Sequence, residues 1–224
     1  MDKRKLKRAA LIRFSSGLVV MGAMFFGLAG TLRFWEAWAF MAVLFIPASL
    51  VVLYFLRHDP EVLERRMKAK EERTQQKTIM TGFSVVSLGA FLIPGLDHRY
   101  GWSSVPTTVV VLADVLFLAG YIITFLTLRE NRFASRTIRV EKDQTVITSG
   151  PYSIVRHPMY LGSTLMLLFA PLALGSYWAM IPTLTTPFFL ALRTLDEEKL
   201  LVEELPGYRD YMKQTRYRVV PRVW

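Results

Sequence analysis

T-T-V-V-V-L-A-D-V-L-F-L-A-G-Y-I-I-T-F-L-T-L, Thr107 to Leu128, is the stretch that decides the fold. Asp114 is the one charged residue among its 22 positions. A helix needs about 20 mostly apolar residues to cross the hydrocarbon core of a bilayer. The stretch therefore predicts one transmembrane helix.

Three more segments meet the same length requirement: Leu11 to Thr31, Ala37 to Leu56 and Thr78 to Leu96. A fifth apolar block, Tyr160 to Leu192, is too long for one span and is interrupted at Gly175-Ser176. We expect it to form a hairpin of two short spans. The sequence thus predicts an all-α polytopic membrane protein with about six transmembrane helices and both termini on one side.

The basic residues predict the orientation of these spans. With the N-terminus inside, 26 of the 28 Lys and Arg residues fall on the inner side, and only Arg33 and Arg99 lie outside. Cytoplasmic loops carry such an excess of positive charge, so we expect both termini in the cytoplasm of a bacterial or archaeal cell. Tryptophan favours the membrane interface, and four residues of this type fall at the predicted outer boundary: Trp35, Trp38, Trp102 and Trp178.

Composition excludes several other classes of protein. The chain is 52% hydrophobic with a formal net charge of +10, but its basic residues alternate with apolar blocks, which argues against nucleic-acid binding. It has no cysteine, which excludes thiolate metal sites and cysteine nucleophiles, and we expect no metal site. The basic N-terminus and first span could alternatively be a signal peptide. The charged run after Asp59-Pro60, up to residue 73, predicts an amphipathic helix on the cytoplasmic membrane surface.

A polar motif, G-P-Y-S-I-V-R-H-P-M-Y-L-G, occupies Gly150 to Gly162 at the start of the hairpin. Pro158 suits the first turn of a helix and disfavours helical geometry at His157, so the fifth span should begin at Pro158. We expect the amides of Met159, Tyr160 and Leu161 to lack intrahelical partners and to attract an anion such as a carboxylate.

The turn at Gly150-Pro151 should bring Tyr152 and Arg156 to the same place. A purely structural explanation stays open, in which Arg156 and Tyr160 reach for the interface and His157 caps the helix.

A second polar motif, R-T-L-D-E-E-K-L-L, runs from Arg193 to Leu201 and extends the sixth span beyond the membrane. Arg193 and Glu197 are one helical turn apart, as in an exposed ion pair of little energetic weight. Alternatively, an acidic residue here could bind the hydroxyl pair of a ribose. The turn at Pro206-Gly207 should fold Tyr208 to Tyr211 back toward the motif.

These two motifs together, with P-G-Y-R-D-Y after them, resemble the isoprenylcysteine carboxyl methyltransferase family, which is related to phospholipid N-methyltransferases. The resemblance covers the chain from about Glu130 onward. It implies a cytoplasmic pocket for S-adenosylmethionine built by the C-terminal region. Tyr152, His157, Pro158, Met159 and Tyr160 would line its methionine part, Arg193 with Glu197 or Glu198 its ribose and adenine, and Tyr208 and Tyr211 would cover it.

The implied reaction is methyl transfer to a lipid or lipidated acceptor at the cytoplasmic membrane face. A carboxylate acceptor, such as an isoprenylcysteine, is ionised at pH 7 and needs a cation to hold it. Arg129, Arg132 and Arg156 are candidates, with Asn131 as a hydrogen-bond donor. Glu130 could accept a proton from an amine headgroup, or could simply pair with a neighbouring arginine.

Two other functions stay open: an NADPH-dependent membrane reductase of a sterol-like or isoprenoid substrate, and a non-enzymatic transporter or assembly factor. Asp114 bears on the last, because an intramembrane carboxylate is a functional candidate, although it could instead face a threonine or a water-filled crevice. We divide the chain into four spans over 1–128, with a cytoplasmic segment at 57–77, and a methyltransferase region over 129–224. That region holds the hairpin at 158–192 and a cytoplasmic tail.

Overall fold

The computed structural model describes the chain except for residues 1–2, 69–73, 135–136, 139 and 141–142. All the regular secondary structure of the described part is helical, which confirms the predicted all-α class. In chain order the helices are α1 (Lys3–Ala29), α2 (Trp35–His58), α3 (Pro60–Lys68), α4 (Thr74–Tyr100), α5 (Thr107–Glu130), the 3-10 turn η1 (Gly150–Ser153), α6 (Pro158–Ala173), α7 (Met180–Thr183), α8 (Thr186–Glu204) and α9 (Tyr208–Gln214).

Four of these helices, α1, α2, α4 and α5, are long and apolar enough to cross a membrane. They coincide with the four predicted spans and extend beyond them at most ends, most clearly at α1, which begins eight residues before Leu11. Charged and polar residues continue these helices past the apolar core without a break. The protein is therefore an integral membrane protein.

The hairpin is also present, with a sharp break where it was predicted. The first arm, α6, has 16 residues, which is shorter than a usual span. Gly175 adopts a left-handed conformation with φ 69°, and the Ser176 amide donates to the Pro171 carbonyl. The returning arm consists of α7 and α8, and α8 continues to Glu204, as the extension of the sixth span predicted.

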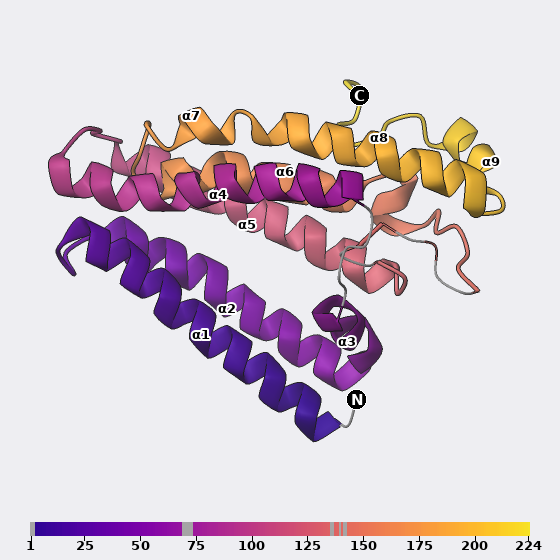
Figure 1. The fold of residues 1–224 in the computed structure, drawn as a ribbon, viewed down its shortest axis with the longest axis horizontal. Helices are drawn as coiled ribbons and strands as arrows, with labels where there is room; N and C mark the ends of the chain where they lie inside the picture. Colours follow the sequence, from indigo (N-terminus) through magenta and orange to yellow (C-terminus); the bar gives the residue numbers. More distant parts are fainter. Residues whose placement is uncertain (1–2, 69–73, 135–136, 139, 141–142) are drawn as a thin grey trace.

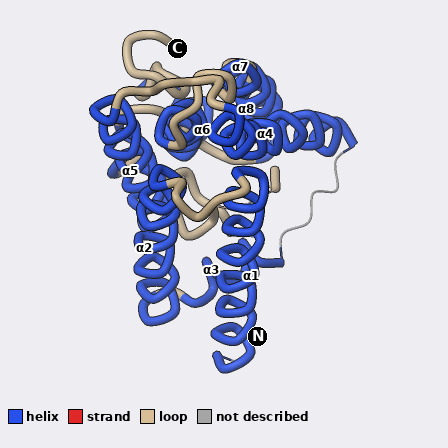
Figure 2. The backbone as a smooth tube through the Cα atoms, turned by 90° about the vertical axis from the view of Figure 1, so that its left-hand side faces the viewer, coloured by secondary structure: helices blue, strands red, loops and turns tan. Residues whose placement is uncertain are grey.

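Along the long axis, both chain termini lie in the same half of the molecule as α3 and α9, with the N-terminus and the C-terminus on opposite sides (Figure 1). Seen along the helices, α6 lies between α5 and α8, while α1 and α2 project from this layer as a pair (Figure 2). Helix α3 is the predicted amphipathic helix, and the later part of that charged run, at 69–73, falls outside the described residues.

Helices α5 and α6 cross at two glycines. A Cβ on Gly120 would lie 2.6 Å from the Gly162 carbonyl oxygen, and a Cβ on Gly162 would lie 2.6 Å from the Gly120 carbonyl oxygen. Small residues let membrane helices approach this closely. The last glycine of the 150–162 motif thus serves helix packing.

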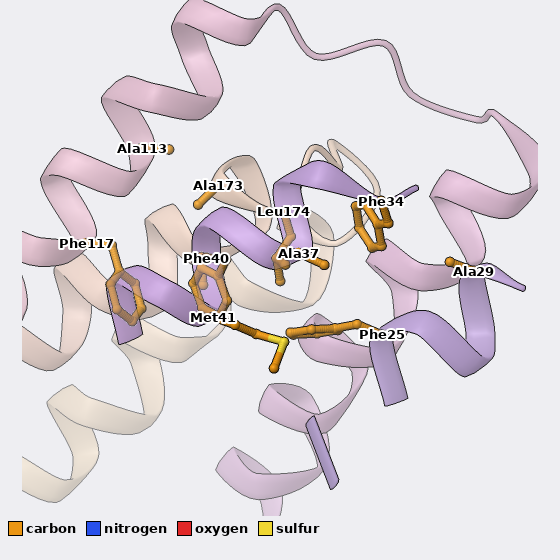
Figure 3. Packing of buried hydrophobic residues seen from close by; sticks show 11 residues of the cluster. Phe25, Ala29, Phe34, Ala37, Phe40, Met41, Ala113, Phe117, Ala173 and Leu174 are labelled. Carbon is orange, nitrogen blue, oxygen red and sulfur yellow. The ribbon is translucent and has the colours of Figure 1, made fainter. Parts of the chain in front are cut away.

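The hydrophobic core joins α1 and α2 to α5 and α6, in the half of the molecule away from α3 and α9. Phe40 of α2 packs edge-on against Phe25 of α1 and Phe117 of α5, at centroid distances of 6.1 and 4.9 Å (Figure 3). Ala37, Ala173 and Leu174 close the same cluster. Because Phe40 of α2 contacts both α1 and α5, this cluster fixes α1 and α2 against the layer that carries the C-terminal motifs.

A buried carboxylate ties the loops together at that same end. Asp97 is only 1% exposed and accepts bonds of 2.6 Å from both the amide and the hydroxyl of Ser103. The Ser176 hydroxyl donates to it as well. Asp114, in α5, is also buried, and its Oδ1 has no hydrogen-bond partner among the described residues.

Candidate functional site

A cavity of about 250 Å³ lies where α6 begins and the polar part of α8 runs alongside it. This volume is near the lower end of small-molecule pockets, which start at roughly 300 Å³. Residues from α3, α4, α6, α8 and α9 line it, together with the segment between α5 and η1. The sequence-predicted residues among them are Asn131, Tyr152, Arg156, His157, Pro158, Met159, Tyr160, Arg193, Glu197, Tyr208 and Tyr211.

Helix α6 begins at Pro158 with His157 at its N-cap position, as predicted. The amides of Tyr160 and Leu161 both donate to the His157 carbonyl, at 3.0 and 3.3 Å. The prediction that these two amides would be available to an anion is therefore wrong. The carbonyl of an N-cap residue accepts the first intrahelical bond, and here it accepts from both amides.

The His157 side chain makes no helix-capping bond. Its Nε2 lies 3.3 Å from Glu198 Oε1 and 3.5 Å from the Tyr208 hydroxyl, and its ring stacks on Tyr160 at 5.6 Å. His157 thus lies between α6, α8 and α9, and its ring contacts a residue of each of these three helices.

Glu198 is the centre of a buried ionic cluster. It accepts bonds of 2.7 Å from the Nε atoms of Arg156 and Arg218. Burial opposes its ionisation, but the bonds from His157, Arg156 and Arg218 outweigh burial and lower the pKa of Glu198 to about 2. Arg156 also donates to the carbonyls of Thr215 and Arg216, at 2.8 and 2.7 Å. The cluster therefore fastens the C-terminal tail to α6 and α8.

Glu197, one residue earlier, has a different environment. The Tyr160 hydroxyl donates to its Oε2 at 2.5 Å, and its side chain is 27% exposed. Arg193 Nε donates to the same hydroxyl at 3.0 Å, and Arg193 Nη1 donates to Gln76 Oε1 at 3.0 Å. Tyr160 thus lies between the two residues for which an ion pair was predicted. Of the two glutamates, Glu197 is the one that lines the cavity.

Tyrosines from η1 and α9 form the next wall. Gly207, with φ 84°, turns the chain into α9, so the predicted fold-back is present. The Tyr211 hydroxyl donates to the Tyr152 carbonyl at 2.7 Å, and Asn131 Nδ2 donates to the Tyr152 hydroxyl at 2.9 Å. Burial raises the pKa of Tyr211 to about 12 and raises that of Tyr208 further. All these phenols stay protonated at neutral pH.

Four predicted site residues do not belong to the described lining of the cavity: Arg129, Glu130, Arg132 and Glu198. Arg129 is exposed at the end of α5. Glu130 accepts a bond from the Ser149 hydroxyl, and a Cβ on Gly150 would lie 3.1 Å from its carboxyl carbon. Glu130 therefore contacts the turn that presents Tyr152.

Several lining residues come from the first half of the chain, where the motifs gave no signal. Arg66 of α3 and Met80 and Phe83 of α4 line the cavity. Gln76 of α4 is fully buried and bridges Arg193 and Asp196 of α8. A polar residue one turn before an apolar span, such as Gln76, is the only sequence signal that could have pointed to this contact.

Comparisons with known proteins bear on the family and on the fold. Residues 108–206 match the family model of phospholipid methyltransferases. No curated protein sequence matches the chain. A solved structure, the eukaryotic intramembrane Ras methyltransferase ICMT (isoprenylcysteine carboxyl methyltransferase), is similar at 14% identity and a TM-score of 0.54, over 96% of this chain and 77% of that chain. Residues 108–206 therefore resemble phospholipid methyltransferases, and the chain shares the fold of that solved intramembrane methyltransferase.

Proposed function

We propose that this protein transfers a methyl group from S-adenosylmethionine to a lipid or lipidated acceptor at the cytoplasmic face of the membrane. The observation that carries the proposal is one cavity whose walls come from both C-terminal motifs, Tyr152 to Tyr160 and Arg193 to Glu197, with α9 beside them. The matching family region spans both motifs.

The residues of the cavity suit this cofactor chemically. It carries an amino acid group, a sulfonium centre, a ribose diol and an adenine, and when bound it supplies an activated methyl group. Glu197 offers a partly exposed carboxylate that can accept bonds from hydroxyl groups. Tyr208 and Tyr211 offer protonated phenols and aromatic faces. Met159, Leu201 and Leu205 supply apolar wall.

The chain's own contribution to such a transfer is alignment and exclusion of water. Tyr160 is held from two sides by Glu197 and Arg193, so it has little freedom to move. Asn131 and Tyr211 fix Tyr152 in the same way. Rigid positioning of two reactants in a dry site contributes several kcal/mol to catalysis, up to about 7–11 in favourable cases. A carboxylate acceptor would need no general base.

Ligand-induced thermal stabilisation tests the proposal. Purified protein in detergent should be stabilised by adenosylhomocysteine, because a ligand that binds only the folded state raises the free energy of unfolding. At 100 times Kd we expect a rise in Tm of about 5–11 °C. NADPH at the same concentration should have no effect. Stabilisation by NADPH without adenosylhomocysteine would instead indicate a membrane reductase.

A further inference from the structure

The C-terminal tail, residues 215–224, pairs through its backbone with the residues just before α6. The Arg156 amide donates to the Tyr217 carbonyl at 2.9 Å. The His157 amide donates to the Arg218 carbonyl at 2.7 Å. The tail therefore holds the backbone of the first polar motif at the N-cap of α6.

The side chain of Arg218 binds the centre of the buried ionic cluster. Its Nε donates to Glu198 Oε2 at 2.7 Å. The other oxygen, Oε1, accepts from Arg156 Nε at 2.7 Å and lies 3.3 Å from His157 Nε2. The terminal torsion of a glutamate has a broad energy minimum, so a carboxylate bound through one oxygen can still rotate. Binding of both oxygens fixes its plane and keeps Oε1 toward His157.

A turn at the end of the tail fixes Arg218 itself. The amides of Arg218 and Val219 donate to the Trp224 backbone oxygen, at 2.9 and 3.0 Å. The turn places the Trp224 indole against the Arg218 guanidinium, whose Cζ lies 5.3 Å from the ring centroid. A cation over an aromatic face is attracted electrostatically. Arg218 is therefore held by both Glu198 and Trp224.

His157 links this arrangement to the cavity. It belongs to the described lining of the cavity, and Arg218 and Trp224 do not. Its Nδ1 lies 3.9 Å from Glu197 Oε2, and its ring stacks on Tyr160. The contact at Nε2 therefore determines which edge of the ring lies beside Glu197, the carboxylate proposed to bind the hydroxyl groups of the cofactor.

On the basis of the proposed function, we infer that Arg218 is a positioning residue of the cofactor site. It holds His157 at two points, the backbone amide through its own carbonyl and the ring through Glu198. The residues that bind a ligand must be locked in orientation by a second layer of bonds. Arg218 supplies that layer from a segment outside residues 108–206, which match the family model.

Calorimetric titration with adenosylhomocysteine measures the effect on the site in purified protein. Arg218→Gln should raise the Kd about tenfold, as for the loss of one charged hydrogen bond. Arg218→Lys keeps a cationic donor and should stay within about threefold of the parent. The matched control, Arg216→Gln, removes the same charge from an exposed position of the tail and should leave the Kd unchanged. Trp224→Leu removes only the ring over Arg218 and should raise the Kd about threefold, which keeps the inference testable where Arg218→Gln does not fold.

An NMR signal of His157 separates positioning from a general loss of stability. The chain has three histidines, so labelling of the imidazole nitrogens gives three ring signals, and His157→Gln identifies the one that belongs to His157. The parent without ligand should show a His157 ring N–H that exchanges slowly with water, because the ring is buried and its Nε2 faces Glu198. Arg218→Gln should lose this signal, whereas Arg218→Lys and Arg216→Gln should keep it.

The inference is overturned if Arg218→Gln keeps the parent's Kd, if it keeps the ring N–H signal, or if Arg216→Gln changes either to the same extent. A lower Tm of Arg218→Gln with an unchanged ring signal would show that Arg218 serves the fold alone, which also overturns the inference. A parent protein that binds no adenosylhomocysteine contradicts the proposed function. The ring signal, recorded without ligand, still tests whether Arg218 positions His157.

Discussion

At the scale of single residues, two adjacent glutamates have opposite surroundings. Glu197 lines the cavity, accepts from the Tyr160 hydroxyl and lies 3.9 Å from His157 Nδ1. Glu198 is instead bound by two arginines and lies 3.3 Å from His157 Nε2. Consecutive residues of a helix lie on different faces, so Glu197 lines the cavity while Glu198 contacts Arg156 and Arg218. The sequence predicted that one of the pair binds the cofactor, but it could not say which, because the partners Arg218 and Tyr160 lie far along the chain.

Glu197→Gln should therefore reduce cofactor affinity with little loss of stability. The amide can still accept from Tyr160, but it lacks the charge that strengthens bonds from ligand hydroxyls. We expect the Kd for adenosylhomocysteine to rise by about tenfold or more. Isothermal titration measures this effect, and an unchanged Kd would place the ribose elsewhere.

Glu198→Gln is the contrasting variant, and it should destabilise the fold by about 3 kcal/mol, because it leaves Arg156 buried without its counter-charge. The folded pKa of Glu198 is about 2, below its ordinary value of 4.5. Its contribution to stability is thus complete above pH 4.5 and is lost as the pH falls toward 2. Thermal unfolding of the parent should show this loss, and the variant should lack that part of the pH dependence. Equal acid sensitivity in both would contradict the assignment.

At the scale of elements, the positions of the helices were predicted well. The length of an apolar segment and the proline or glycine at its ends can both be found in a short stretch of sequence. Pro158 marked the start of α6, and Gly175 marked the break after it. Contacts between elements were not predictable in this way. Arg66 and Gln76 reach the site from helices that carry no motif. Glu130 is the last residue of α5, and there its carboxylate accepts from the Ser149 hydroxyl beside the η1 turn.

The crossing of α5 and α6 provides a test at this scale. Gly162→Ala should destabilise the protein by roughly 1–3 kcal/mol, because the added methyl group would meet the Thr124 hydroxyl and the Gly120 carbonyl. Displacement of α6 should also weaken adenosylhomocysteine binding. Gly27→Ala in α1 is the control, since a Cβ there meets nothing within 4 Å. Equal Tm values for the two variants would show that the crossing tolerates a larger residue.

At the scale of the whole molecule, the distribution of basic residues along the sequence and the arrangement of the helices can be compared. Both termini, α3 and α9 lie in one half of the molecule along its long axis (Figure 1). The exposed residues Trp102 and Trp178 belong to the connections that follow α4 and α6. Most residues of the cavity belong to segments whose basic residues predict a cytoplasmic location, from which a water-soluble cofactor could enter. This coincidence links the orientation of the protein to its proposed chemistry.

Because the chain has no cysteine, single-cysteine variants can test that orientation directly. Arg209→Cys in α9 and Ser104→Cys before α5 are both at exposed positions. In intact cells, a membrane-impermeant maleimide should label Ser104→Cys and leave Arg209→Cys unlabelled until the membrane is opened, because positive loops stay inside. The reverse pattern would place the cavity outside the cell, away from its proposed methyl donor, and would contradict the proposed function together with the orientation.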